Sequence, residues 1–137
     1  MAYEAILFEK RGHVAILTLN RPDRLNAINP ALRAEVHEAV GEAHADDHIL
    51  APIVTGAGKG STPAPTSPAS SRRCLSPDSG MSYFLPRSIG YARAADLIFT
   101  SRAVDAEEAH RLGLLDRLVA RAALIEESVK LAGEMTQ

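Results

Sequence analysis

The sequence has little cysteine and no long apolar run, and each shortage excludes a class of protein. The single cysteine, Cys74, cannot form an intramolecular disulfide, which argues against a disulfide-stabilised secreted domain and for a reducing compartment. No apolar run approaches the roughly 18 residues of a membrane span, and the N-terminal residues do not resemble a signal peptide. We therefore expect a cytoplasmic protein with no membrane partner.

The chain also lacks a strong charge of either sign. Its 15 Lys and Arg are balanced by 17 Asp and Glu, which leaves a net charge of -2. Binding to nucleic acid or to an anionic membrane depends on a broad positive field, so neither partner is expected. With 137 residues, 46% of them hydrophobic, the chain can bury one small core, and a small diffusing substrate fits it better.

The first 60 residues combine strand and helix signals. Two β-rich runs at residues 3–9 and 13–19, separated by a turn at Gly12, predict an antiparallel hairpin. Asn29 before Pro30 predicts a helix start, and apolar residues at three- and four-residue spacing continue the helix to Ala43. An apolar strand at 51–55 then leads into the glycine-rich residues 56–60. This order of elements is typical of an α/β protein.

Residues 61–74 interrupt this pattern, because they are rich in proline and serine and fit no periodic element. Beyond them the sequence predicts a helix at 91–100, and a second that is capped by Asp105 with Glu108 and stopped at Gly113. A short extended run at 114–119 and an amphipathic helix at 122–135 complete the chain. We divide it into an N-terminal β-β-α-β block (1–60), an irregular joint (61–74) and a helical C-terminal block (75–137).

Residue spacing alone predicts no active site. The glycines at 56–60 match neither known phosphate-binding pattern and are interpreted as a strand-exit turn. The five histidines lack partners at metal-ligand spacing, so no metal is expected. Adjacent carboxylates at 46–47 and 107–108 would diverge by about 100° on a helix and cannot act as an acid/base pair. The serines of 61–82 lack the strand–turn–helix context of a nucleophile.

Two blocks of the sequence nevertheless resemble the enoyl-CoA hydratase/isomerase (crotonase) family. The first, residues 3–60, carries the pattern Asn-Arg-Pro-x-x-x-Asn-Ala at 20–27 and the glycine-rich exit. The second runs from Leu75 to about Val119. The resemblance implies an α/β fold, a fragment of the β-β-α spiral, and assembly into homotrimers or hexamers. It also implies the addition of water across the double bond of a 2-enoyl-CoA thioester, as in fatty-acid β-oxidation, with no separate cofactor.

The resemblance carries over to particular residues. In the family, the segment that corresponds to 24–27 lies against coenzyme A, largely through its backbone, which implies Arg24, Leu25 and Ala27 as substrate-binding positions. Tyr83 and Phe84 would line what remains of the acyl pocket, or else belong to the ordinary core. The carboxylate nearest to them in the second block, Asp78, stands in a Pro-Asp-Ser-Gly context that favours a turn residue.

The family's catalytic motif is missing, so no catalytic residue is predicted. Family members polarise the thioester carbonyl with two backbone N–H groups, one of them from a Phe-x-Ala-Gly-Ala-Asp motif expected directly after Gly60. Here both alanine positions fall on Pro63 and Pro65, which have no N–H to donate. The central segment that supplies the other donor and a glutamate is absent, and no carboxylate lies between Ser61 and Ser76 to replace the second glutamate.

A reading-frame change explains this gap. Read one base earlier, codons 60–68 can encode the missing motif in register, so we hypothesise a one-base deletion near codon 60, followed by loss of the central segment. Three alternatives to the hydratase stay open. They are an isomerase or other acyl-CoA enzyme on the same scaffold, a non-catalytic CoA-binding module, and two small helical pieces joined by a linker whose Arg72 and Arg73 attract a partner.

Overall fold

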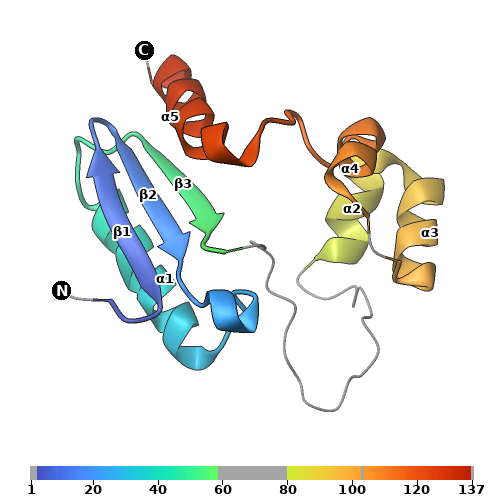
Figure 1. The fold of residues 1–137 in the computed structure, drawn as a ribbon, viewed down its shortest axis with the longest axis horizontal. Coiled ribbons are helices and arrows are strands. Elements are labelled where there is room, and N and C mark those ends of the chain that lie inside the picture. The colour runs from blue at the N-terminus through green and yellow to red at the C-terminus, as the bar shows by residue number, and fades with distance from the viewer. Residues whose placement is uncertain (1–2, 59–79, 103, 137) are drawn as a thin grey trace. The chain divides into compact units, whose positions relative to one another are not determined.

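The computed structural model describes residues 3–58, 80–102 and 104–136 (Figure 1). These residues fall into two compact units, which are treated one at a time. The first unit holds the three strands, helix α1 and the C-terminal helix α5, and the second holds helices α2, α3 and α4. The predicted joint at 61–74 lies outside the described residues. None of the described helices is long and apolar enough to cross a membrane.

The sheet of the first unit has the strand order β1-β2-β3. Strands β1 (Ile6–Arg11) and β2 (Val14–Leu19) form the predicted antiparallel hairpin, and Gly12 takes a positive φ of 59° at its turn. Strand β3 (Ala51–Gly56) lies parallel to β2, with Ile53 opposite Ile16. The connection between β2 and β3 is helix α1, as parallel strands require.

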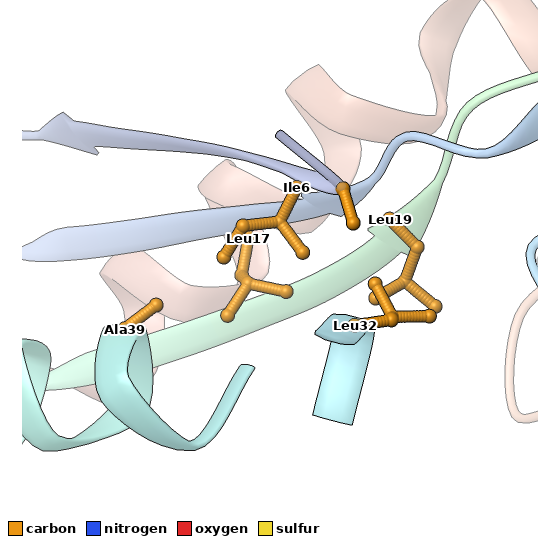
Figure 2. Close-up of a cluster of buried hydrophobic side chains, with 6 residues drawn as sticks. Ile6, Leu17, Leu19, Leu32 and Ala39 are labelled. Atoms are coloured by element: carbon orange, nitrogen blue, oxygen red, sulfur yellow. The ribbon is translucent and has the colours of Figure 1, made fainter. Parts of the chain in front are cut away.

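Helix α1 (Pro30–His44) covers one face of this sheet. Its first turn begins where the sequence predicts, because the Asn29 side chain accepts a hydrogen bond of 2.8 Å from the Leu32 N–H. Leu32 and Ala39 face the sheet, and Figure 2 shows them beside side chains from the first two strands. The residues that form this core are Ala5, Ile6, Leu17, Leu19, Leu32 and Ala39.

Helix α5 (Leu124–Met135), preceded by the short 3-10 helix η2 (Arg121–Ala123), covers the opposite face. Ala132 is buried against Val14 and Ile16, with Ile125 and Val129 packed around them. Two covered faces explain why Val14, Ala15, Ile16 and Leu17 are all buried, because a strand with one wet face would alternate. The last helix of the C-terminal sequence block thus belongs to the same unit as the N-terminal block.

The second unit is helical, and its first helix, α2 (Met81–Ile89), was not predicted. Helix propensity does not predict this helix, because Pro86 lies inside it and a glycine stands at each end. Leu85 and Ile89 are buried against Ala94 and Leu97 of α3 (Tyr91–Thr100), and this packing outweighs the local preference. Helix α3 keeps its predicted bounds.

Helix α4 (Ala106–Leu112) confirms the predicted cap. The Asp105 carboxylate accepts a 2.7 Å hydrogen bond from the Glu108 N–H, and Gly113 ends the helix with a φ of 83°. Only half of a capping box forms, because both Glu108 carboxylate oxygens accept hydrogen bonds of 2.9 Å from Arg102. Residues 114–119, expected to be extended, form no strand.

Candidate functional site

The segment predicted to contact coenzyme A is a compact loop between β2 and α1. It begins with the 3-10 helix η1 (Pro22–Arg24), after which Leu25 and Asn26 take φ angles of 50° and 56°. Consecutive left-handed residues other than glycine are rare, because the Cβ crowds the backbone in this conformation. Their presence means that tertiary contacts hold the loop in place.

Asn26 supplies those contacts. Its side chain is fully buried, and its Oδ1 accepts a 2.8 Å hydrogen bond from the Arg21 N–H. Its Nδ2 donates a 2.9 Å hydrogen bond to the Ala57 carbonyl, just beyond β3. The amide therefore ties the loop to the glycine-rich strand exit, so the two sequence signatures of the first block meet in one structure.

Gly58 follows Ala57 directly and lies against Pro22 at the start of the loop. A Cβ placed on it would lie 2.7 Å from the Pro22 Cβ, and its φ of 79° is also unfavourable for a side chain. Glycine is thus required at this position for two reasons, close approach and conformation. The Arg121 guanidinium of η2 donates a hydrogen bond to the Gly58 carbonyl, so the C-terminal segment also contacts the strand exit.

The three predicted binding residues differ in accessibility. Arg24 has 70% of its side chain exposed beside Asp23, at an N–O distance of 3.4 Å, and Leu25 is 65% exposed. Ala27 is buried, and its carbonyl accepts a 2.7 Å hydrogen bond from the Arg21 guanidinium. A ligand therefore has access to the side chains of Arg24 and Leu25, while Ala27 holds the loop in shape. Their binding roles stay predictions.

The backbone N–H groups of Arg24–Ala27 are already used in hydrogen bonds within the loop. The N–H groups of Arg24, Leu25, Asn26 and Ala27 all donate to carbonyls within the loop, at N–O distances of 2.9 to 3.3 Å. Backbone contacts to a ligand must therefore come from carbonyl oxygens, which accept hydrogen bonds. This arrangement suits a ligand group that donates hydrogen bonds, such as an amine or amide.

A depression of about 670 Å³ lies beside the loop, at the start of α1. It is lined by Ile28, Asn29, Pro30, Arg33, Ala34 and His37. Ile28 is 50% exposed, so the depression has an apolar wall beside the cationic Arg33. Residue spacing alone gives no reason to single out Arg33.

Tyr83 and Phe84, the predicted acyl-pocket residues, lie on α2 in the second unit and are 55% and 63% exposed. Their rings meet edge to face at a centroid distance of 5.1 Å. The Arg87 guanidinium lies 3.5 Å from the centroid of the Tyr83 ring and donates to the Tyr83 carbonyl. Neither aromatic ring belongs to the buried core of its unit, and the predicted contact with an acyl chain stays a prediction.

Two carboxylates with lowered pKa values belong to ion pairs at the surface. A hydrogen bond from Lys10 lowers the pKa of Asp46, and one from Arg102 lowers the pKa of Glu108. Neither carboxylate is held neutral by burial, as a catalytic acid would be. No cluster of His, Cys, Asp and Glu able to hold a metal occurs among the residues that the structure describes. Pro63, Pro65 and Asp78 lie outside the described residues.

Known proteins match this chain along its whole length. The family model for enoyl-CoA hydratase/isomerase matches residues 68–137. A probable enoyl-CoA hydratase of Mycobacterium bovis is 30% identical over 198 residues, covering 100% of this chain and 77% of the relative. One of Rhizobium meliloti is 28% identical over 193 residues, covering 96% and 75%. Both alignments are longer than this chain, so residues of these relatives have no counterpart here.

Solved structures agree on the fold. A monofunctional enoyl CoA isomerase from M. smegmatis superposes with a TM-score of 0.82 at 26% identity, over 96% of this chain and 85% of that one. An enoyl-CoA hydratase from Bacillus anthracis gives a TM-score of 0.86 at 20% identity, over 97% and 77%, and is evidence for the fold alone. The family model matches half of the chain and a relative is 30% identical over 77% of its own length, and on this basis the chain belongs to the enoyl-CoA hydratase/isomerase family.

Proposed function

We propose that this chain binds 2-enoyl-CoA thioesters through the loop at Pro22–Ala27 and does not hydrate them. The supporting observation is the loop itself, which Asn26 holds in one conformation with Arg24 and Leu25 exposed. A preformed loop of this kind lowers the entropic cost of binding. The thioester is the ligand, and no separate cofactor is proposed.

Electrostatics support an anionic ligand at this place. Coenzyme A carries phosphate groups, and Arg24 and Arg33 place guanidinium groups on the loop and in the adjoining depression. Guanidinium groups bind phosphate oxygens with charge-assisted hydrogen bonds. The carbonyl oxygens of the loop would accept hydrogen bonds from amino or amide groups of the ligand.

The proposed absence of turnover rests on the sequence. Hydration needs two N–H donors to stabilise the enolate-like anion and carboxylates to activate water and deliver a proton. Proline replaces the alanine donors at positions 63 and 65, and the segment 61–76 contains no carboxylate. Loss of one such donor costs a hydrolase about 10²–10³ in rate, so the combined loss should remove measurable activity.

A second candidate function is isomerisation of the enoyl double bond. It is favoured by the likeness to the isomerase from M. smegmatis, at 26% identity. An isomerase also needs a carboxylate to move the proton, so the same gap argues against turnover by this chain. The threefold assembly that the resemblance implies stays a prediction.

Calorimetric titration of the full chain with crotonyl-CoA tests the proposal. We expect saturable binding, with the Arg24→Ala variant about fivefold weaker because one charge–phosphate contact is lost. Arg117→Ala, which removes an exposed arginine of the second unit, is the matched control and should bind as the wild type does. Equal affinities of both variants, or no binding by the wild type, would contradict the proposed loop site.

A separate assay tests the proposed absence of hydration. Crotonyl-CoA incubated with the full chain should keep its enoyl absorbance and yield no hydroxyacyl product, which mass spectrometry would detect by the mass of the added water. Isomerisation leaves the mass unchanged and would be detected as a loss of the enoyl absorbance without a new mass. Rapid hydration would show that a donor and a carboxylate come from elsewhere in the chain. Isomerisation without hydration would support the second candidate.

A further inference from the structure

Two consecutive carbonyl groups at the strand exit, residues 57–58, accept hydrogen bonds from distant parts of the chain. The Ala57 carbonyl accepts the 2.9 Å bond from the Asn26 side chain, which belongs to the proposed binding loop. The Gly58 carbonyl accepts a bond from the Arg121 guanidinium of η2, at the start of the C-terminal segment that continues into α5. The loop and the C-terminal segment therefore hold neighbouring peptide groups of the same strand exit.

The strand exit in turn determines where the binding loop lies. Pro22, the first residue of η1, packs so closely on Gly58 that a Cβ placed there would lie 2.7 Å from the Pro22 Cβ. The Pro22 carbonyl accepts a 3.3 Å hydrogen bond from the Leu25 N–H, and Asn26 is bonded to Ala57. Because closely packed groups transmit displacements, a shift of the strand exit would move both the start and the end of the loop.

The helix that follows Arg121 holds this residue in place. Helix α5 buries Ala132 against Val14 on the N-terminal sheet, and Glu126 in its first turn accepts a 3.0 Å hydrogen bond from Arg11. A guanidinium donates a charge-assisted hydrogen bond, which is stronger than a bond between two neutral groups. The docked C-terminal segment can therefore fix the position of the carbonyl that it contacts.

We infer that Arg121 is a positioning residue, which holds the binding loop in place by fixing the strand exit and does so without touching the ligand. This inference rests on the proposed binding function of the loop. A loop held in its binding conformation avoids the cost of becoming ordered on binding, so a looser strand exit should weaken the affinity. The coupling is reciprocal, because a ligand that stabilises the loop must equally stabilise the docked C-terminal segment.

The direct alternative is that Arg121 binds a phosphate group of the ligand. Arg121 is exposed, so such a contact would be screened by salt and its loss would matter less at high ionic strength. Loss of a positioning residue removes the same factor of affinity at low and at high ionic strength. It also alters the loop before any ligand is added. Salt dependence and measurements on the free protein therefore separate the two roles.

Nuclear magnetic resonance of the free full chain provides the first test. Arg121→Ala should shift the side-chain amide resonances of Asn26 and speed their hydrogen exchange severalfold, because the Ala57 carbonyl loses its fixed position. Lys130→Ala, which removes another exposed cation from the C-terminal segment, is the matched control and should leave these resonances unchanged. Far-UV circular dichroism checks that both variants fold. Unchanged Asn26 resonances in Arg121→Ala would overturn the inference.

Calorimetric titration with crotonyl-CoA provides the second test. We expect Arg121→Ala to bind about fivefold more weakly than the wild type at both ionic strengths, and Lys130→Ala to bind as the wild type does. Arg121→Lys, which keeps a donor, should recover part of the affinity. Full affinity in Arg121→Ala, or a loss confined to low ionic strength, would contradict the positioning role alone. A wild type that binds no crotonyl-CoA would contradict the proposed function, while the Asn26 resonances still decide the coupling.

Hydrogen exchange of the full chain tests the reciprocal effect. The informative amides are those of α5 that exchange faster than the amides of β2, because they exchange by local opening of the C-terminal segment. Saturating crotonyl-CoA should slow their exchange in the wild type and leave it unchanged in Arg121→Ala. Equal slowing in the two proteins would show that the ligand acts on α5 by another route, and would overturn the role of Arg121.

Discussion

Leu25 and Asn26 hold backbone angles that side chains other than glycine rarely adopt, and they do so side by side. The buried amide of Asn26 offsets this cost with hydrogen bonds to the Arg21 N–H and the Ala57 carbonyl. Leu25 makes the loop accessible and Asn26 makes it rigid, so the proposed binding function depends on a residue that a bound ligand need not touch.

We predict that Asn26→Ala lowers the free energy of unfolding by about 2–4 kcal/mol, because two part-buried backbone groups lose a partner and alanine tolerates a positive φ poorly. Leu25→Gly, at the neighbouring position, should leave the stability unchanged or raise it by up to about 1 kcal/mol, since glycine relieves the strain. Urea unfolding of both variants provides the comparison. Equal losses in the two variants would contradict the special role of the Asn26 amide.

At the scale of the elements, the ends of the helices are fixed partly by local side-chain caps and partly by contacts between elements. Asn29 and Asp105 cap α1 and α4 through their own side chains, and neither cap needs a distant partner. Arg102 adds a longer connection, because it joins the segment after α3 to Glu108 of α4 with two hydrogen bonds of 2.9 Å. The end of α3 is thus tied to the start of α4.

This connection predicts a pH dependence. The hydrogen bond from Arg102 lowers the pKa of Glu108 below its ordinary value of 4.5, so its contribution to stability is present above that value and is lost as the pH falls through the lower, folded pKa. Thermal unfolding should show Arg102→Ala below the wild type at neutral pH, with a difference that shrinks below about pH 4.5. Arg93→Ala, on the exposed face of α3, is the control. A difference that stays constant into strong acid would contradict the role of Glu108.

At the scale of the whole molecule, the first unit is assembled from both ends of the sequence. Helix α5 comes after the second unit in the chain, yet it buries Ala132 on Val14 and Ile16 of the N-terminal sheet. Both faces of β2 are therefore covered. The same unit carries the proposed binding loop.

We predict that Ala132→Asp destabilises the first unit by about 3–5 kcal/mol, because it places an unpaired carboxylate against the apolar face of β2. Lys130→Asp, two residues away and exposed, should have little effect. Hydrogen exchange at the β2 amides is the measurement, since it reports this unit alone. Matching exchange rates in the two variants would show that α5 does not cover the sheet in solution.

Much of the fold could be predicted from local chemistry. The start of α1 at Pro30, the bounds of α3 and the cap of α4 follow from single residues whose side chains act within a few positions. Helix α2 could not be predicted, because Pro86 and the flanking glycines oppose it locally and burial of Leu85 and Ile89 decides the outcome. The role of Asn26 could not be predicted either, although asparagine is, after glycine, among the residues that best tolerate a left-handed angle.

By itself the sequence determined the family, the hairpin, the start of α1 and the absence of carboxylates in 61–76, because these depend on residue identity and short-range spacing. Only the tertiary structure decided that the loop at 20–27 is hydrogen-bonded to the end of β3 and that α5 covers one face of the N-terminal sheet. Each of these depends on which backbone groups and apolar faces meet across long stretches of chain. No local pattern encodes such a meeting.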